Sequence, residues 1–348
     1  MAGFPERPSR AGGRRLNIAD ESPEAVMCEG WFDARRLAPL GDGHINETLL
    51  VETDRGRFVL QRINERVFPD PQAVAEKVHR VVAYLQSAAP GRVPALEPTR
   101  RGDYVWRDHR GGFWRLWHYV ENTRTLQELD NSRQAQSAGR AFGELQNLLR
   151  GFPSAVDDPV PGFMQLDHYL GAFEAALNMA SAPPADAENL LGFIEPRRGL
   201  AELFAVRDRL VHADCKVDNL LFSLESDEVV GILDLDTVMF GHWAWDFGDL
   251  ARSAAVEAGG FSIDRLVALV KGFVPAAGID PTPDELLMAP RYVALMLGVR
   301  FLTDHLRGDR YFRVTAPGDN LRRAREQFAL LEDMEREEPQ LREFLRRV

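Results

Sequence analysis

Cysteine is almost absent from this sequence. Among 348 residues, only Cys28 and Cys215 are cysteines. Two thiols cannot form a disulfide framework, and they cannot supply a zinc site built from cysteines. The fold must therefore rest on a buried apolar core, which a chain of this length can supply. We expect both cysteines to be free thiols in a reducing compartment.

The chain also lacks an excess of positive charge and a long uninterrupted apolar run. Its formal net charge is −11, which argues against a general nucleic-acid binder. The longest apolar stretch, residues 286–302, contains Arg291 and Arg300, so we expect a buried helix and no membrane partner. The arginine-rich first residues run into an acidic stretch, not an apolar one. We therefore expect no signal peptide and a cytoplasmic protein.

The pattern of apolar residues predicts an α+β fold with two lobes of unequal size. Residues 1–20, rich in Gly, Pro, Ser and Arg, are expected to be a loose tail. Residues 21–120 predict a small lobe, with strands at 48–53, 57–63, 103–108 and 113–120 and one helix at 70–86. Residues 121–348 predict a larger, mainly helical lobe with one strand pair, 219–222 and 229–233. Its helices are expected at roughly 126–150, 167–181, 187–208, 244–258, 262–276, 283–308 and 318–346.

One stretch of the larger lobe combines residue types that carry phosphoryl-transfer chemistry. His212, Asp214, Lys216 and Asn219 follow one another at short spacing, and Asp234 ends the next strand. If the strands 219–222 and 229–233 pair antiparallel, Asn219 and Asp234 meet at one end of the hairpin. This order and spacing are those of a kinase catalytic loop and its metal-binding residue.

Each of these five positions has its own expected role. Asp214 would accept the proton of the attacking hydroxyl, and Lys216 would offset charge on the transferred phosphoryl group. His212 would brace the loop through hydrogen bonds. Asn219 and Asp234 would hold Mg²⁺, which prefers oxygen ligands and leaves positions for the phosphates of a substrate.

Further carboxylates near this stretch allow more than one interpretation. Asp236 is compatible with a second metal ligand or outer contact, and equally with a residue that only holds the loop. Asp246 could face the substrate. Asp249 fits better as the partner of Arg252 at the start of a helix.

The small lobe offers candidates for binding a nucleotide. Gly41, Gly43, His44 and Asn46 precede the strand 48–53, where glycines allow a backbone to approach phosphates closely. Two glycines before a strand also occur in ordinary turns.

The lysine that a protein kinase carries on its next strand is missing here. Gln61 and Arg62 occupy that place, and Glu76 lies on the following helix. Because strand side chains alternate, only one of the two residues can enter the cleft. Arg62 could hold phosphate and pair with Glu76, and it fits equally as a surface arginine.

Two segments, HADCKVDNLLF and GILDLDT, resemble the aminoglycoside phosphotransferase and choline kinase superfamily, which has a protein-kinase-like fold. GDGHINET, FVLQRINERVF, ILDLDTVMFGHWAWDFGDLAR and GVRFLTDHLRGDRYF resemble the N-acetylhexosamine 1-kinase family. The likeness extends through NLRRAREQFALLEDME to Glu335 and thus covers nearly the whole chain after the tail.

This resemblance implies phosphorylation of the anomeric hydroxyl of an N-acetylhexosamine with ATP and Mg²⁺. It implies that Asp214 is the base, that Asn219 and Asp234 bind the metal, and that residues 41–46 form the phosphate loop. It also makes the FVLQRIN strand, with Gln61 and Arg62, a trait of the family.

The acceptor remains the open part of this prediction. Residues 163–169 depart from the family pattern, which leaves the identity of the sugar in doubt. Arg300 and Asp304 are candidate sugar ligands, and a buried salt bridge is the alternative. A kinase for an aminoglycoside, a choline-like or an amino-alcohol acceptor also stays open, as does a catalytically inactive nucleotide-binding protein.

Overall fold

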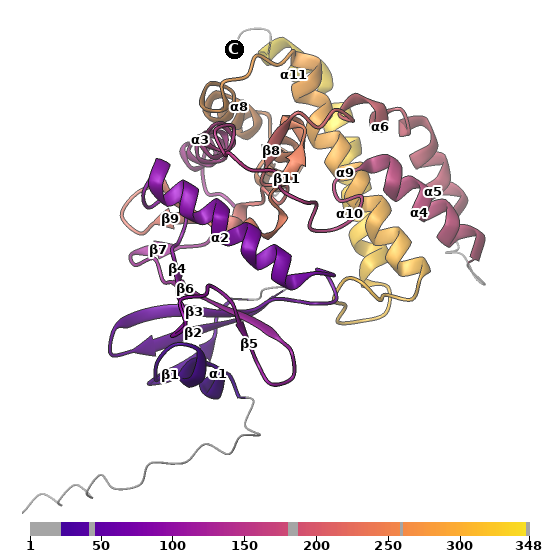
Figure 1. Ribbon diagram of the computed structural model, residues 1–348. Helices are drawn as coiled ribbons and strands as arrows, with labels where there is room; N and C mark the ends of the chain where they lie inside the picture. The colour runs from indigo at the N-terminus through magenta and orange to yellow at the C-terminus, as the bar shows by residue number, and fades with distance from the viewer. Residues whose placement is uncertain (1–21, 42–45, 180–186, 258–259, 346–348) are drawn as a thin grey trace, which may run out of the picture.

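The protein folds into a small sheet lobe and a larger helical lobe (Figure 1). The computed structural model describes residues 22–41, 46–179, 187–257 and 260–345. Residues 1–20, expected to be a tail, lie outside these ranges. The predicted α+β class and two-lobe architecture are confirmed.

The small lobe is built on one antiparallel sheet of six strands. Its strands run in the order β1-β2-β3-β6-β4, and β5 pairs with β6. The predicted hairpin is confirmed as β2 and β3, which meet at Thr53 and Gly56. Strand bounds are β1 (Arg36–Pro39), β2 (Glu47–Thr53), β3 (Gly56–Arg62), β4 (Leu96–Glu97), β5 (Trp106–Arg107) and β6 (Phe113–His118).

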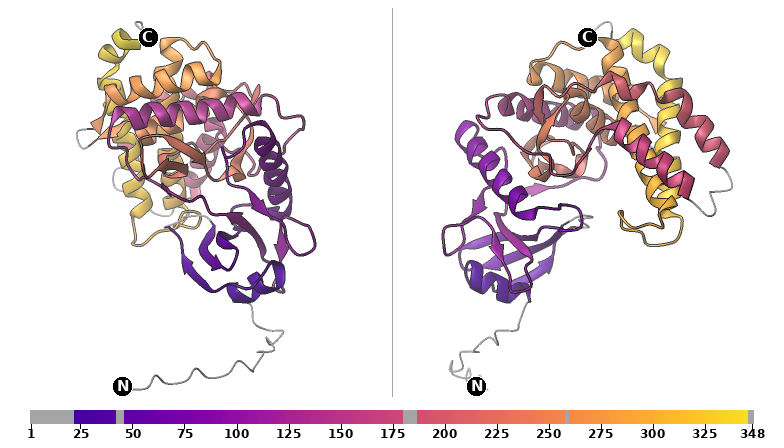
Figure 2. Two further views of the ribbon diagram at one scale, coloured as in Figure 1. Left: turned by 90° about the vertical axis from the view of Figure 1, so that its left-hand side faces the viewer. Right: turned by 45° about the vertical axis from the view of Figure 1, so that its right-hand side comes forward.

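Two helices cover opposite faces of this sheet. The outer face packs Phe58, Leu60 and Leu116 against α1 (Pro23–Gly30). The other face turns toward α2 (Pro71–Ala88), which begins at the N-cap Asp70. Both views in Figure 2 place α2 along the boundary between the sheet and the large lobe.

The large lobe is mainly helical, with three short strand groups. The predicted hairpin is present as β9 and β10, and β7 extends it. The pair β8–β11 and the pair β12–β13 have no counterpart in the sequence prediction. Strand bounds are β7 (Thr123–Arg124), β8 (Arg209–Val211), β9 (Leu220–Ser223), β10 (Val229–Ile232), β11 (Met239–Gly241), β12 (Val256–Glu257) and β13 (Gly260–Phe261).

Two of the predicted long helices are interrupted. The helix expected at 187–208 is wrong: Pro196 lies in a 3₁₀ turn, and only short helices flank it. The helix expected at 318–346 ends at Arg336 and a second one follows. Helix bounds are α3 (Ser132–Leu149), α4 (Leu166–Met179), α5 (Ala187–Ile194), α6 (Leu200–Leu203), α7 (Trp243–Ala254), α8 (Ile263–Ala277), α9 (Pro283–Leu306), α10 (Asp319–Arg336) and α11 (Glu338–Leu345).

Helix α9 forms the centre of the large lobe. By length and composition it could cross a membrane, yet 78% of its most apolar window is buried inside the protein. It packs against α4, α7 and α10. The predicted buried helix is therefore confirmed.

Helices α3 and α8 approach each other closely because glycines lie at their contact. A Cβ atom on Gly139 would lie 2.4 Å from the carbonyl oxygen of Leu269, and one on Gly272 would lie 2.1 Å from that of Gln136. The obstructing atoms are backbone, which cannot rotate away. Alanine at either position must push the two helices apart.

We predict that Gly139→Ala lowers the free energy of unfolding by about 1–3 kcal/mol, because overpacking outweighs the better helix propensity of alanine. Urea unfolding with an unchanged m-value would measure this loss. The matched control is Gly171→Ala on the exposed face of α4, where a Cβ meets no atom within 4 Å. The control should be neutral or stabilising, and equal effects at both positions would contradict the packing argument.

Candidate active site

The catalytic loop leaves β8 through a strained turn that one buried carboxylate holds in place. Ala213 has a φ of 63°, a conformation that non-glycine residues rarely adopt. The side chain of Asp246, in the first turn of α7, accepts hydrogen bonds from the backbone N–H of His212 (3.0 Å) and of Ala213 (2.8 Å). Gln146 donates a third, at 3.0 Å. Asp246 is 1% exposed and does not line the cavity, so its suggested contact with substrate is wrong.

His212 ties the catalytic loop to the loop after β10. Its Nδ1 accepts from the N–H of Asp214 (3.2 Å), so its Nε2 carries the proton and donates to the carbonyl of Leu233 (2.9 Å). The hydroxyl of Thr237 donates to the backbone oxygen of His212 at 2.8 Å. These contacts are those of a brace between two loops.

The side chains of Asp214, Lys216 and Asn219 meet at one point. Oδ2 of Asp214 accepts from Nδ2 of Asn219 at 2.8 Å and lies 3.1 Å from Nζ of Lys216. Burial alone would raise the pKa of Asp214, but the charge of Lys216 and the hydrogen bonds from Asn219 and Lys216 outweigh it and lower this pKa. Asp214 is therefore an ionised carboxylate that is ready to orient a hydroxyl group.

Asp234 is a half-buried carboxylate whose charge the protein leaves uncompensated. It has a left-handed backbone with φ of 58°, and within the described residues its Oδ1 has no hydrogen-bond partner. Burial and the charges of Asp236 and Asp214 raise the pKa of Asp234 to about 6. A divalent cation would supply the missing positive charge.

The donor set at this point fits Mg²⁺. Asn219 uses its amide nitrogen to bind Asp214, which leaves its amide oxygen as an acceptor, and its backbone carbonyl accepts from the N–H of Leu233, the residue before Asp234. No group of three His, Cys, Asp or Glu that could hold a metal occurs among the residues that the structure describes. Asn219 and Asp234 would therefore share the ion with oxygens from outside the protein, as Mg²⁺ commonly does with nucleotide phosphates.

We predict that Asp234→Asn stabilises the metal-free protein by roughly 1–3 kcal/mol at about pH 8. A raised folded-state pKa means that folding favours the protonated carboxyl, so this stabilising effect is lost as the pH rises through about 6. Asparagine removes the charge, and its advantage should shrink below that pH. Urea unfolding at both ends of the range would measure it.

The control for this prediction is Asp208→Asn, a surface carboxylate with 55% of its side chain exposed. It should change stability little at either pH. A loss of stability in Asp234→Asn, or a gain that does not depend on pH, would contradict the account.

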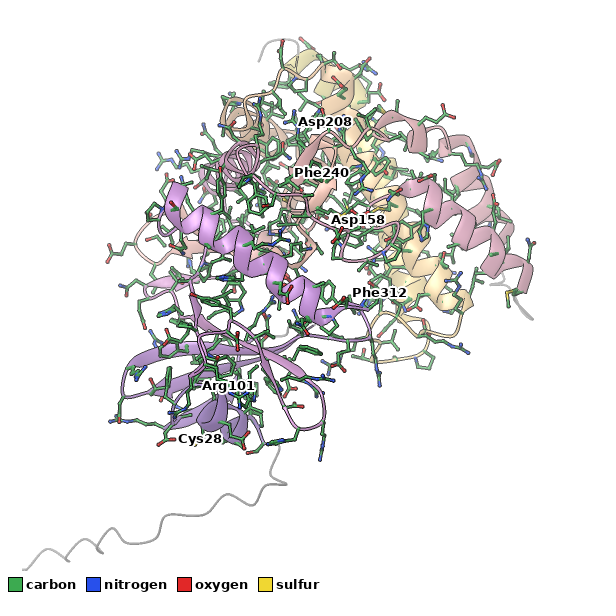
Figure 3. The ribbon with its side chains drawn as sticks, in the orientation of Figure 1. Cys28, Arg101, Asp158, Asp208, Phe240 and Phe312 are labelled. Atoms are coloured by element: carbon green, nitrogen blue, oxygen red, sulfur yellow. The ribbon has the colours of Figure 1, made fainter. Side chains whose placement is uncertain are left out.

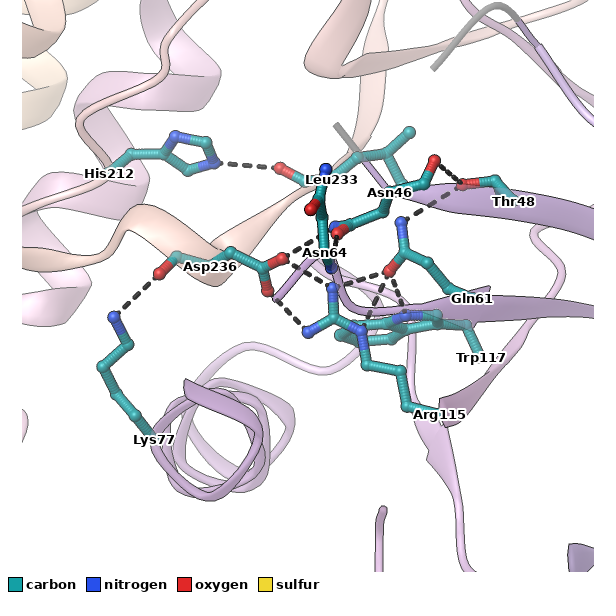
Figure 4. A network of polar contacts seen from close by, with 10 residues as sticks. All are labelled: Asn46, Thr48, Gln61, Asn64, Lys77, Arg115, Trp117, His212, Leu233 and Asp236. Atoms are coloured by element: carbon teal, nitrogen blue, oxygen red, sulfur yellow. Dashed lines mark hydrogen bonds and ion pairs between the residues drawn. The ribbon is translucent and has the colours of Figure 1, made fainter. Parts of the chain in front are cut away.

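Asp236 lies at the centre of a polar network that crosses from one lobe to the other (Figure 4). Its Oδ1 is 2.5 Å from Nη1 of Arg115, and its Oδ2 is 2.8 Å from Nη2. Asn46 also donates to Oδ2 at 2.9 Å, and Lys77 donates to the backbone oxygen of Asp236 at 2.8 Å. Both carboxylate oxygens are occupied, so the geometry supports the loop-holding alternative and not a metal ligand.

The structure decides which residue of β3 faces the other lobe. Oε1 of Gln61 accepts from Nε (2.9 Å) and Nη2 (2.6 Å) of Arg115 and from Nε1 of Trp117 (3.2 Å). Gln61 therefore orients Arg115. Arg62 extends on the opposite face, where its guanidinium lies 5.8 Å from the ring centre of Trp114.

Of the two alternatives for Arg62, the pair with Glu76 is not found. Glu76 is exposed and accepts a hydrogen bond from Gln72 on its own helix. The residue that α2 turns inward is Lys77, one of only three lysines in the chain. Burial lowers the pKa of Lys77 to about 8, although the charge of Asp236 opposes the shift.

The predicted phosphate loop is described only at its ends. Gly41 is exposed with a φ of 70°, and Gly43 and His44 lie outside the described residues. Asn46 is 7% exposed, and its Oδ1 accepts from the N–H of Asn64 at 3.0 Å. With its amide on Asp236, Asn46 anchors the end of the loop. A role of this loop in phosphate binding stays a prediction.

A cavity of about 380 Å³ opens beside the catalytic loop. Asp214, Lys216 and Asp234 line one side of it. The small lobe contributes residues between β3 and α2, and the large lobe contributes the loop after α9, on which Figure 3 labels Phe312. The lining includes Asn46, Asn64, Val67, Phe68, Phe163, Asp249, Arg252, Arg300, Phe301, Tyr311, Phe312, Arg323 and Glu326. The predicted partners Asp249 and Arg252 are bonded at 2.7 Å.

Asp304 shapes this wall without touching the cavity. Its carboxylate accepts from the backbone N–H groups of Arg310, Tyr311 and Phe312, each at 2.9 Å. It is 5% exposed and also accepts from Asn320. Neither the sugar-ligand role nor the salt bridge considered for Asp304 is found; it holds the loop that carries Tyr311 and Phe312.

Arg300 faces the cavity from within a box of aromatic rings. Its guanidinium carbon lies 5.3, 4.9, 5.7 and 5.3 Å from the ring centres of Phe163, Tyr169, Tyr311 and Phe312. Among the residues that the structure describes, Arg300 has no hydrogen-bond or ion-pair partner. Its N–H groups are therefore available to a ligand.

The fold and this site together define a phosphotransferase of the protein-kinase-like class. The carboxylate of Asp214 is bonded to Lys216 and to the amide of Asn219 on one loop of the large lobe, and Asp234 on the next loop of the same lobe has a carboxylate oxygen without a partner among the described residues. The model of the phosphotransferase enzyme family matches residues 36–282. The chain belongs to this family, the aminoglycoside phosphotransferase and choline kinase superfamily, and is a small-molecule kinase.

Solved structures with a similar fold come from several kinases. An aminoglycoside phosphotransferase from Alicyclobacillus acidocaldarius is 15% identical, with 97% of this chain and 99% of that one covered at a TM-score of 0.65. A choline/ethanolamine kinase family protein from Mesorhizobium loti is 19% identical, with 88% and 92% covered at 0.56. An amicoumacin kinase in complex with AMP-PNP and Ca²⁺ is 16% identical, with 89% and 91% covered at 0.61. At these identities the likeness concerns the fold.

Proposed function

We propose that this protein transfers the γ-phosphoryl group of ATP to the anomeric hydroxyl of a sugar, an N-acetylhexosamine or a related hexose. The observation that carries the proposal is the cavity, which brings Asp214 and Lys216 together with Arg300 and the aromatic loop after α9. The sequence resemblance to N-acetylhexosamine 1-kinases supports the choice of sugar and of hydroxyl. AMP-PNP in a structure of similar fold supports ATP as donor.

The residues of the catalytic loop and of the turn at Asp234 would have separate roles in phosphoryl transfer, which follow from their contacts. Asp214 orients the acceptor hydroxyl and takes its proton, and Lys216 places its charge beside the transferred group. Asn219 and Asp234 would hold Mg²⁺. The bound ion would neutralise charge on the phosphates.

The aromatic box around Arg300 bears on whether the acceptor is a neutral sugar or a cation. Aromatic ring faces bind ammonium groups through cation–π contacts, and here four rings already surround the guanidinium of Arg300. A choline-like or aminoglycoside cation would meet this positive charge. A sugar instead offers hydroxyl and amide oxygens to the N–H donors. This contrast favours a neutral acceptor over the cationic alternatives.

We predict that Asp214→Asn lowers kcat by roughly 10²–10⁴-fold, because the amide can no longer take the proton. ATP binding should stay close to that of the unchanged protein, since Asp214 is assigned to the acceptor. Steady-state kinetics and isothermal titration with ATP would measure the two effects. The surface variant Asp208→Asn is the control, and near-normal turnover of Asp214→Asn would exclude the assignment.

We predict that Arg300→Met lowers kcat/KM for the sugar by about 10–100-fold through the loss of charged hydrogen bonds. The KM for ATP should not change. Choline, which should not bind the unchanged protein, should become a measurable competitive inhibitor once the box is vacated. The control is Arg307→Met, an exposed arginine just after α9. Equal inhibition by choline before and after Arg300→Met would refute the argument for a neutral acceptor.

A further inference from the structure

We propose that Arg115 is a positioning residue for the metal-binding turn, acting through Asp236 in place of the missing strand lysine. The inference rests on the proposed use of a metal–nucleotide complex. It concerns a residue of β6 that no sequence motif singles out.

The charged and polar contacts around Asp236 join the two lobes. Asp236 belongs to the large lobe, whereas Arg115, Lys77 and Asn46 all come from the small lobe. Arg115 and Asp236 are each 1% exposed. A buried ion pair of this kind has a well-defined geometry, because either charge left alone would be costly. Every partner in this network is a protein group, so the network by itself can fix the position of the loop.

The guanidinium of Arg115 uses all three of its nitrogens in these contacts. Its Nη1 and Nη2 bind the two oxygens of Asp236, and its Nε and Nη2 bind Oε1 of Gln61. Register explains the arrangement, since Gln61 lies directly opposite Arg115 on the neighbouring strand. In this geometry the guanidinium has little capacity left for a phosphate group. Arg115 therefore acts through Asp236, and it is not itself a phosphate ligand.

The contacts of Asp236 also hold the neighbouring residue Asp234 in position. The chain passes from Asp234, in its left-handed conformation, into the short 3₁₀ turn Leu235–Thr237, with Asp236 at its centre. Arg115 holds the side chain of Asp236, and Lys77 holds its backbone oxygen. Without these contacts the unfavourable backbone of Asp234 could relax. Its unpartnered oxygen would then turn away from the place that the metal needs.

The decisive variant replaces the ion pair by two apolar side chains, Arg115→Met with Asp236→Leu. Apolar pairs of similar volume often support folding as well as a buried ion pair does, so the double variant separates positioning from stability. Binding of Mn²⁺ with ADP, followed by electron paramagnetic resonance, replaces activity as the main readout. We expect a thermal midpoint near that of the unchanged protein, Mn²⁺ binding about 10-fold weaker or more, and an unchanged acceptor KM.

A second variant keeps the test decisive if the double variant does not fold. Arg115→Lys retains the charge but loses the two-pronged contact, and we expect a smaller loss of Mn²⁺ binding of about 3–10-fold. The matched control is Glu144→Gln, which breaks the half-exposed pair of Arg92 and Glu144 between the small lobe and α3. It should leave Mn²⁺ binding unchanged.

The outcomes separate this inference from the proposed function. A folded variant that binds Mn²⁺ and ADP as tightly as the unchanged protein would overturn the role of Arg115 alone. Failure of the unchanged protein to bind Mn²⁺ with ADP would overturn both proposals. Weakened Mn²⁺ binding together with a non-sugar acceptor would support the role of Arg115 and refute the sugar.

Discussion

The site depends on buried carboxylates whose charge the protein's own N–H groups compensate. Asp246 binds the backbone of the catalytic loop, Asp304 binds that of the loop after α9, and Asp236 binds Arg115. Each fixes a segment that would otherwise have many conformations. Asp234 is the contrasting case, because its Oδ1 lacks a partner among the described residues. Where compensation is missing, a cation is the expected ligand.

Long periodic segments of this fold could be predicted from the sequence, and short ones could not. Helix α2 and the hairpin of β2 with β3 carry clear apolar periods, helix α9 is a long apolar run, and all were predicted. The helix expected at 187–208 was wrong because Pro196 and Gly199 interrupt it. Strands such as β8 and β12 have too few residues to show an alternating pattern.

The candidate site was predictable where its residues are neighbours in the chain. The loop around Asp214 has a recognisable spacing, whereas the contact of Arg115 with Asp236 joins residues 121 positions apart. One residue of this network, Lys77, could nonetheless have been found from the periodicity of the sequence. On α2 the buried residues Val74, Val78 and Val81 form one stripe, and Lys77 falls on it while Glu76 does not. Helical phase would therefore have pointed to the lysine.

The measurement that tests the central claim most directly is phosphorus NMR of the product formed with ATP and Mg²⁺. The acceptors supplied would be N-acetylhexosamines, hexoses, an aminoglycoside and choline. The account predicts a sugar phosphate whose phosphorus couples to the anomeric proton, with loss of the reducing end. A product phosphorylated at another hydroxyl, or turnover of only the cationic acceptors, would contradict it.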